Sequence, residues 1–196
     1  LRNSSAASDV YKRQVKSYPA GDKKLTDISD EIHIGAMAFM RKEYSILFMF
    51  SLILVFGIYI GLGFSSTVAF IVGAVTSSAT GFIGMYAATK ANVRTATAAQ
   101  NSGVSDSLSV AFFGGSIMGL TVAAMGLLGL GFLYILYGSD PETVSTIHGF
   151  GMGASTVALF SRVGGGIFTK SADVGADLVG KVCLLYTSPS PRDLRK

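Results

Sequence analysis

The chain has 196 residues, one cysteine and two histidines, and its mean hydropathy of +0.50 is high for a soluble protein. A single cysteine excludes a disulfide framework, and so few cysteines and histidines exclude a zinc cluster. Sixteen Lys and Arg against twelve Asp and Glu give a formal charge of +4, but the meaning of that charge depends on which residues are native.

The two ends of the sequence are complementary to each other as DNA. DVYKRQ (residues 9–14) can be encoded as GAT GTG TAT AAG AGA CAG, and the reverse complement of these codons, shifted by one base, translates as CLLYTS (residues 183–188). This DNA resembles a transposon adapter ligated to fragments in sequencing libraries. We therefore predict that residues 1–14 and 183–196 are non-native, and that residues 15–182 are an internal piece of a longer gene.

Leaving out the predicted ends removes the excess of positive charge. Ten Lys and Arg and ten Asp and Glu remain, so the basic isoelectric point gives no reason to expect a nucleic-acid partner. The only cysteine, Cys183, lies in the excluded tail.

Residues 27–45 form the first predicted element. Apolar and charged side chains alternate there at helical spacing, which indicates an amphipathic helix that lies at a membrane interface and leads into the first span. His33 has no evident partner in the sequence, so we interpret it as a polar-face residue and not as a ligand. We interpret His148, near the start of the last span, as a hydrogen-bonded packing residue.

Long stretches without a charged residue dominate the rest of the chain. A membrane span needs about 20 mostly apolar residues, and these stretches are long enough for four. The predicted spans are residues 44–63, 67–89, 108–137 and 143–166, the last continuing as a helix to residue 182. A large soluble core is the alternative, but helices of this length in a soluble protein would show a polar face. The predicted fold class is therefore all-α, a polytopic membrane helix bundle.

Pairs of small residues at helix-packing spacing occur within the spans. They are found in GIYIG (Gly57, Gly61), GSIMG (Gly115, Gly119) and GFGMG (Gly149, Gly153). Such pairs let helix backbones approach closely in a membrane. GFGMGA also imitates a dinucleotide-binding loop, but no strand precedes it, so we interpret it as a packing motif.

Basic residues mark one end of every predicted span. Arg41 and Lys42 precede the first span, Lys90 and Arg94 follow the second, and the connection GSDPE after the third (residues 138–142) has no basic residue. Because cytoplasmic loops are enriched in Lys and Arg, the basic ends are predicted to be cytoplasmic.

The last predicted helix carries five charged residues on one face. On a wheel with about 100° per residue, the positions within one sector are Arg162, Lys170, Asp173, Asp177 and Lys181. Two carboxylates one turn apart can hold Mg²⁺ together with waters and substrate phosphates, and the lysines can contact phosphate oxygens. The pattern therefore fits a phosphoryl-transfer site. The alternative is a solvated helix with Lys/Asp pairs that each contribute a few tenths of a kcal/mol.

Arg162 favours the functional interpretation. It lies about 16 Å along the helix from Asp173 at the usual rise per residue, within or at the edge of the membrane, where an ionisable side chain usually has a function.

Several segments resemble the membrane-integral, ion-translocating pyrophosphatases. They are RVGGGIFTKSADVGADLVGKV (residues 162–182), GFIGMYAATKANVRTATAAQ (81–100), GFGMGASTVALF (149–160) and IHIGAMAFMRKEY (32–44). The resemblance implies an enzyme that hydrolyses pyrophosphate at the cytoplasmic face and moves H⁺ or Na⁺ across a bacterial inner membrane or a eukaryotic vacuolar-type membrane. It also implies a homodimer in the full-length parent.

The resemblance implies a role for each charged residue of the last helix. Asp173 and Asp177 resemble Mg²⁺ ligands, Lys170 and Lys181 resemble pyrophosphate contacts, and Arg162 resembles part of the ion pathway. The family continues after Val182 with further acidic segments, so we expect this piece alone to be inactive.

Two other classes of function stay open at this point. A non-hydrolytic channel or secondary transporter could also use glycine-rich spans and a charged helix at its mouth. In a purely structural helix bundle, the same charges would form surface pairs only.

Overall fold

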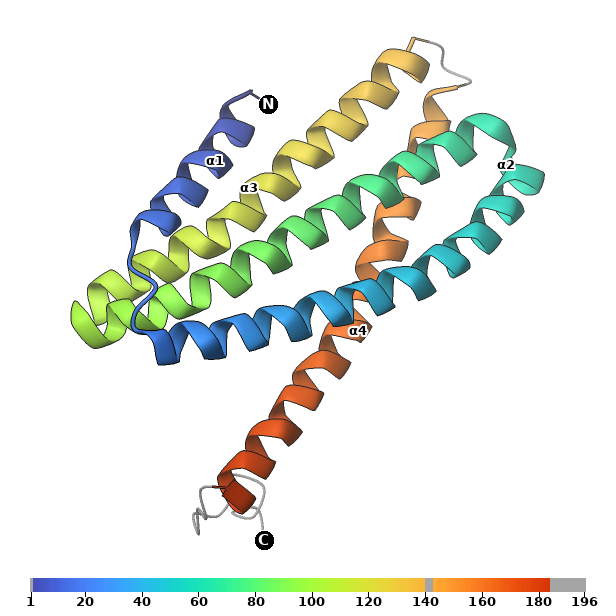
Figure 1. The fold of residues 1–196 in the computed structure, drawn as a ribbon. Coiled ribbons are helices and arrows are strands. Elements are labelled where there is room, and N and C mark those ends of the chain that lie inside the picture. The colour runs from blue at the N-terminus through green and yellow to red at the C-terminus, as the bar shows by residue number, and fades with distance from the viewer. Residues whose placement is uncertain (1, 140–142, 184–196) are drawn as a thin grey trace, which may run out of the picture. The chain divides into compact units, whose positions relative to one another are not determined.

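The computed structural model describes residues 2–139 and 143–183, and every element in that part of the chain is helical. In chain order these are α1 (Arg2–Ser17), α2 (Lys23–Asn101), α3 (Val104–Tyr137), the short 3₁₀ helix η1 (Val144–Ile147), α4 (His148–Leu178) and the π-helix η2 (Val179–Cys183) (Figure 1). The all-α prediction is confirmed. Residues 184–196 of the predicted non-native tail and residues 140–142 of the acidic connection lie outside the described residues.

The helix α2 is a hairpin of two long arms. Asp22 caps its start, because the carboxylate accepts a hydrogen bond from the backbone N–H of Leu25 at 3.0 Å. The arms meet at Gly63, whose φ of 82° and ψ of −179° are non-helical and whose positive φ favours glycine. This turn falls where the sequence separates the first two predicted spans.

The first arm of α2 also contains the predicted interfacial segment. Residues 27–45 continue into the apolar stretch as one helix, and among the residues of α2 only Gly63 leaves the helical conformation. We expected a helix at the membrane surface that leads into the span. The residues are helical as expected and join the apolar stretch without a break, and their position at the membrane surface stays a prediction.

The apolar parts of α2 and α3 are long enough to cross a membrane. Only 6% of the most apolar window of α2 and 22% of that of α3 are buried within the structure. A core helix of a soluble protein would be mostly buried, so these helices present their apolar surface outward. The helix α4 is richer in Gly, Ser and Thr and does not reach the same apolarity, so the fourth span stays a prediction.

The chain divides into two units, Leu1–Phe160 and Ser161–Lys196. In the first unit, α3 packs along the second arm of α2, and α1 lies beside α3 (Figure 1). The buried core of this unit includes Phe70, Val110, Ile117 and Leu133, each at most 3% exposed.

Close glycine contacts join the first part of α4 to the second arm of α2. A Cβ atom on Gly153 would collide with the carbonyl oxygen of Phe70, and a Cβ on Gly73 would collide with that of Phe150. Gly149 also lies close to α2, since its Cβ would be 2.7 Å from the carbonyl oxygen of Ser66. The backbones therefore touch, as the GFGMG motif predicts.

The other two glycine motifs make no such contact within the described residues. A Cβ on Gly57, Gly61, Gly115 or Gly119 would meet nothing within 4 Å. The packing role of GIYIG and GSIMG stays a prediction.

Candidate functional site

The charged face of the second unit is formed by one helical segment. It begins with the last part of α4 and ends in η2, and all five of its predicted site residues are exposed: Arg162, Lys170, Asp173, Asp177 and Lys181. No glycine or proline stops the helix before Leu178, although three consecutive glycines (residues 164–166) lie within it. The helix alone therefore positions these side chains.

Lys170 and Asp173 form the only ion pair among the five charged residues. The Nζ–Oδ2 distance is 4.0 Å, and the two side chains are 52% and 64% exposed. An exposed pair at that distance contributes little to stability, about 0.2–1 kcal/mol before screening by salt. Both groups therefore remain available to a ligand.

Asp173 and Asp177 are one helical turn apart. Four residues advance the helix by about 6 Å, so the two carboxylates face the same side of α4. This donor set fits Mg²⁺, which binds one or two carboxylates and completes its octahedron with water and phosphate oxygens. Within the described residues, no group of three or more His, Cys, Asp and Glu side chains gathers at one place. The two carboxylates would therefore supply only some of the ligands of a metal site.

Lys181 lies in the π-helical turn, beyond the end of α4. A π-helix has a hydrogen bond from residue i to i+5 and turns less per residue than an α-helix. The wheel with 100° per residue therefore applies only as far as Leu178, and it does not give the direction of the Lys181 side chain.

The apolar side chains of this helical segment are exposed as well. Those between 50% and 67% exposed are Val163, Ile167, Val174, Leu178, Val179 and Val182.

The stretch around Lys90 makes one contact between the arms of α2 and one within the second arm. Lys90 Nζ lies 3.4 Å from Asp30 Oδ1, and the guanidinium of Arg94 donates to the carbonyl oxygen of Lys90 at 2.7 Å. These contacts give Lys90 and Arg94 a structural role within α2.

His33 has partners that the sequence did not reveal. Its Nδ1 lies 2.8 Å from Thr89 Oγ1, and its ring meets that of Tyr86 edge-on at 5.4 Å. His33 is thus a contact between the two arms of α2, and our interpretation of it as a residue without a partner was wrong. The sequence contains one signal for this contact. In an antiparallel hairpin, polar residues at similar distances from the turn lie opposite each other, and His33 and Thr89 lie far from Gly63 on the two arms.

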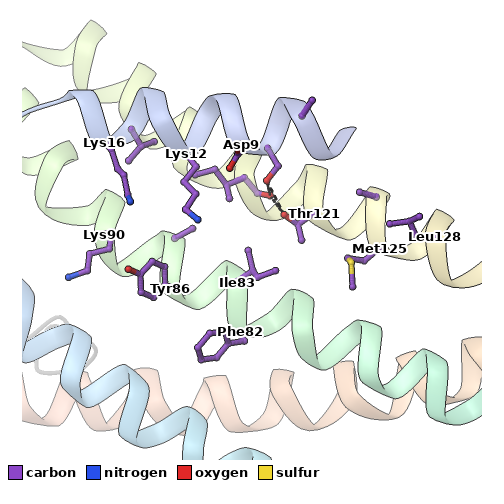
Figure 2. A pocket seen from close by; sticks show the side chains of 16 residues that line it. Asp9, Lys12, Lys16, Phe82, Ile83, Tyr86, Lys90, Thr121, Met125 and Leu128 are labelled. Atoms are coloured by element: carbon purple, nitrogen blue, oxygen red, sulfur yellow. Dashed lines mark hydrogen bonds between the residues drawn. The ribbon is translucent and has the colours of Figure 1, made fainter. Parts of the chain in front are cut away.

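A cavity of about 890 Å³ lies between α1, α2 and α3. Figure 2 shows Lys12 and Lys16 of α1 above Lys90 and Tyr86 of α2, with Thr121, Met125 and Leu128 of α3 along the side. One wall comes from residues 6–12, which we predict to be non-native, so we assign no ligand to this cavity.

Comparison with known proteins gives a family match over nearly the whole chain. Residues 5–192 match the family described as inorganic H⁺ pyrophosphatase. Because the match includes parts of both predicted adapter segments, the boundaries at residues 15 and 182 stay a prediction.

Three curated relatives illustrate the similarity. A K(+)-insensitive pyrophosphate-energized proton pump 2 of Moorella thermoacetica is 44% identical over 179 residues, 88% of this chain and 26% of the relative. A K(+)-insensitive pyrophosphate-energized proton pump of Methanosarcina mazei is 42% identical over 185 residues, 93% of this chain and 27% of the relative. A K(+)-stimulated pyrophosphate-energized sodium pump of Thermotoga maritima is 37% identical over 194 residues, 89% of this chain and 27% of the relative.

The chain spans about a quarter of the length of these relatives. Together with the long, outward-facing apolar helices α2 and α3, the match identifies a multi-pass membrane protein. The chain belongs to the inorganic H⁺ pyrophosphatase family.

Proposed function

We propose that the parent of this chain is a pyrophosphate-energised ion pump, which hydrolyses pyrophosphate at the cytoplasmic face and translocates H⁺ or Na⁺. The observation that supports this most directly is the row of charged, exposed side chains from Arg162 to Lys181 in a chain of this family. Relatives named as proton pumps and as sodium pumps are both similar to the chain, so the proposal includes either ion.

The proposed chemistry is transfer of a phosphoryl group to water. Asp173 and Asp177 would hold Mg²⁺, which, when bound, neutralises charge on the phosphate oxygens of the substrate. Lys170 and Lys181 would contact those oxygens directly, as lysines do in other phosphate sites. The helix α4 fixes the spacing of Lys170, Asp173 and Asp177 before substrate arrives. This lowers the entropic cost of assembling the site.

Arg162 would act in ion movement and not in hydrolysis. It lies eleven residues before Asp173, about 16 Å along the helix axis, which is too far for contact with the same phosphate. A guanidinium stays charged at every physiological pH, so Arg162 can bias a neighbouring carboxylate toward its ionised form without losing its own proton.

The present piece would be inactive by itself. Two exposed carboxylates on a single helix provide one side of a metal–pyrophosphate complex, and additional ligands would have to come from the rest of the parent. We also propose that residues 1–14 and 183–196 are adapter-derived, and that the parent forms a homodimer, which chemical cross-linking of the full-length protein in membranes would test.

The central test uses the completed parent gene, expressed in membranes that lack pyrophosphatase activity. Asp173→Asn and Asp177→Asn should each lower Mg²⁺-dependent phosphate release by about 10²-fold or more, the scale seen when a group that stabilises transition-state charge is removed. Asp106→Asn is the matched control, because Asp106 is an exposed carboxylate in the first turn of α3 and should leave the rate unchanged.

The same experiment separates the three classes of function. Ion flux without pyrophosphate hydrolysis would support a channel or secondary transporter. Unchanged hydrolysis in both Asp variants would mean that the charges of α4 serve stability alone.

A further inference from the structure

An apolar groove of about 600 Å³ lies between the two arms of α2. The first arm contributes Leu47, Phe48 and Leu52, and the second contributes Ile71 and Val75, among others. The groove belongs entirely to the first unit and is separate from the charged helix of the second unit.

The groove has a buried floor and exposed rims. Val157 of α4 lines it and is only 2% exposed, whereas Phe48 and Val75 on the two rims are 66% and 61% exposed. A lining of this kind, apolar and exposed at its rims, is suited to an apolar occupant that enters from the membrane.

A hydrogen bond joins the two arms within the groove. The phenol of Tyr44 donates to the carbonyl oxygen of Ser78 at 2.6 Å, and both residues line the groove. A single acyl chain is narrower than an α-helix with its side chains, which is about 10 Å wide, so it can enter more deeply between the joined arms.

The depth and the charges of the groove match one phospholipid. Its lining on the first arm runs from Tyr44 to Val55, about 16 Å at 1.5 Å per residue, and half of a 30 Å hydrocarbon core is about 15 Å. Arg41 and Lys42 are exposed within one turn of Tyr44, at the level where the headgroup of such a lipid would lie.

We propose that this groove binds a phospholipid with an anionic headgroup. One acyl chain lies between the arms of α2, passing outside the ring of Tyr44, and the phosphate lies beside Arg41 and Lys42. Basic residues next to apolar clefts between spans recognise anionic headgroups in the same way. The predicted cytoplasmic orientation of Arg41 and Lys42 puts this lipid in the inner leaflet.

The proposal can be tested on the completed parent in nanodiscs of phosphatidylcholine and phosphatidylglycerol. A trace of phosphatidylglycerol with a photoreactive acyl chain is activated, and labelled peptides are mapped by mass spectrometry. Labelling should concentrate on residues 44–55 and 70–82. Labelling spread evenly over the exposed apolar surface, or cross-links that join two copies of the chain through this groove, would overturn the proposal.

Filling the groove gives a sharper comparison. Ala79→Phe places a large side chain in the groove and should lower labelling there several-fold, whereas Ala123→Phe, at an exposed position of α3 outside the groove, should not. Ser51→Phe fills the groove from the opposite wall and decides the question if Ala79→Phe does not fold, as judged by helix content. Undiminished labelling in a folded groove variant would contradict the proposal.

The headgroup preference has its own control. Arg41→Gln and Lys42→Gln together remove both positive charges. The ratio of labelling by photoreactive phosphatidylglycerol to labelling by photoreactive phosphatidylcholine should then fall toward the ratio of the two lipids in the nanodisc. Lys23→Gln with Lys24→Gln removes two charges from the start of the same helix, about 27 Å away, and should leave the preference intact. Equal effects of the two pairs would mean that only net charge matters, and the specific headgroup site would be wrong.

Discussion

The Nδ1 atom of His33 lies 2.8 Å from the hydroxyl oxygen of Thr89, across the two arms of α2. The hydroxyl of Thr89 can also donate its proton to the carbonyl oxygen of Tyr86 at 3.0 Å. Because a hydroxyl has a single proton, Thr89 donates to only one of these two partners at a time, and the tautomer of His33 decides which of them it is. Thr89 is 4% exposed, so water does not readily replace this hydrogen bond.

Removing the Thr89 hydroxyl should therefore weaken the hairpin. Thr89→Val keeps the size of the side chain, and His33→Phe keeps a ring against Tyr86. Their coupling energy in a double-mutant cycle should be about 1 kcal/mol, the usual net value for a hydrogen bond. The free energy of unfolding can be measured by helix loss in mixed micelles with rising SDS.

Thr95→Val is the control for that cycle. Within the part of the chain that the structure describes, the Thr95 hydroxyl bonds only to the carbonyl oxygen of Ala91 in its own arm, so its coupling to His33→Phe should be close to zero. Strictly additive effects of Thr89→Val and His33→Phe would show that the contact does not stabilise the hairpin.

The glycine contact between α4 and α2 predicts a difference between two neighbouring substitutions. Gly153→Val should cost about 1–3 kcal/mol more than Gly151→Val, as overpacking of a close contact usually does. Gly151 is in the same helix but a Cβ there would meet nothing within 4 Å, and both changes alter intrinsic helix propensity alike. The same SDS titration measures the free energy of unfolding of both variants. Equal decreases would show that Gly153 has no packing role.

Activity should depend on parts of the parent that this piece lacks. Purified residues 15–182 should release no phosphate from pyrophosphate, with or without Mg²⁺, because two carboxylates cannot enclose the metal–substrate complex. The completed parent should be active with Mg²⁺ and should lose activity when a chelator removes the metal. Mg²⁺-dependent hydrolysis by residues 15–182 alone would contradict the prediction.

The adapter interpretation predicts what the source DNA contains. Amplification outward from primers within codons 90–170 should give a reading frame that leaves the present sequence after Val182 and continues into acidic segments. A frame that continues as CLLYTSPSPRD in genomic DNA would show that the tail is native.

The spacing of charged residues predicted the helices well. A membrane span must be mostly apolar along its whole length, so its limits can be seen in the sequence. The boundary between the first two predicted spans falls at Gly63, and the third predicted span lies within α3 (Val104–Tyr137). Local spacing also correctly predicted the close approach at Gly149 and Gly153.

Contacts between distant residues were harder to predict. The partners of His33 depend on how far one arm of α2 is shifted along the other, and single-sequence periodicity does not contain that register. The site shows the same limit, since the wheel placed the charges of α4 together but could not foresee the π-turn that contains Lys181.

The turn at Gly63 has a consequence for biogenesis. Residues 44–89 carry no charge, and one non-helical residue reverses the chain, so no polar loop has to be carried through the bilayer. The two arms can leave the translocon laterally as a preformed pair, with the basic residues at both outer ends retained on the ribosome side. The orientation of both spans in the membrane would then be set in a single insertion step.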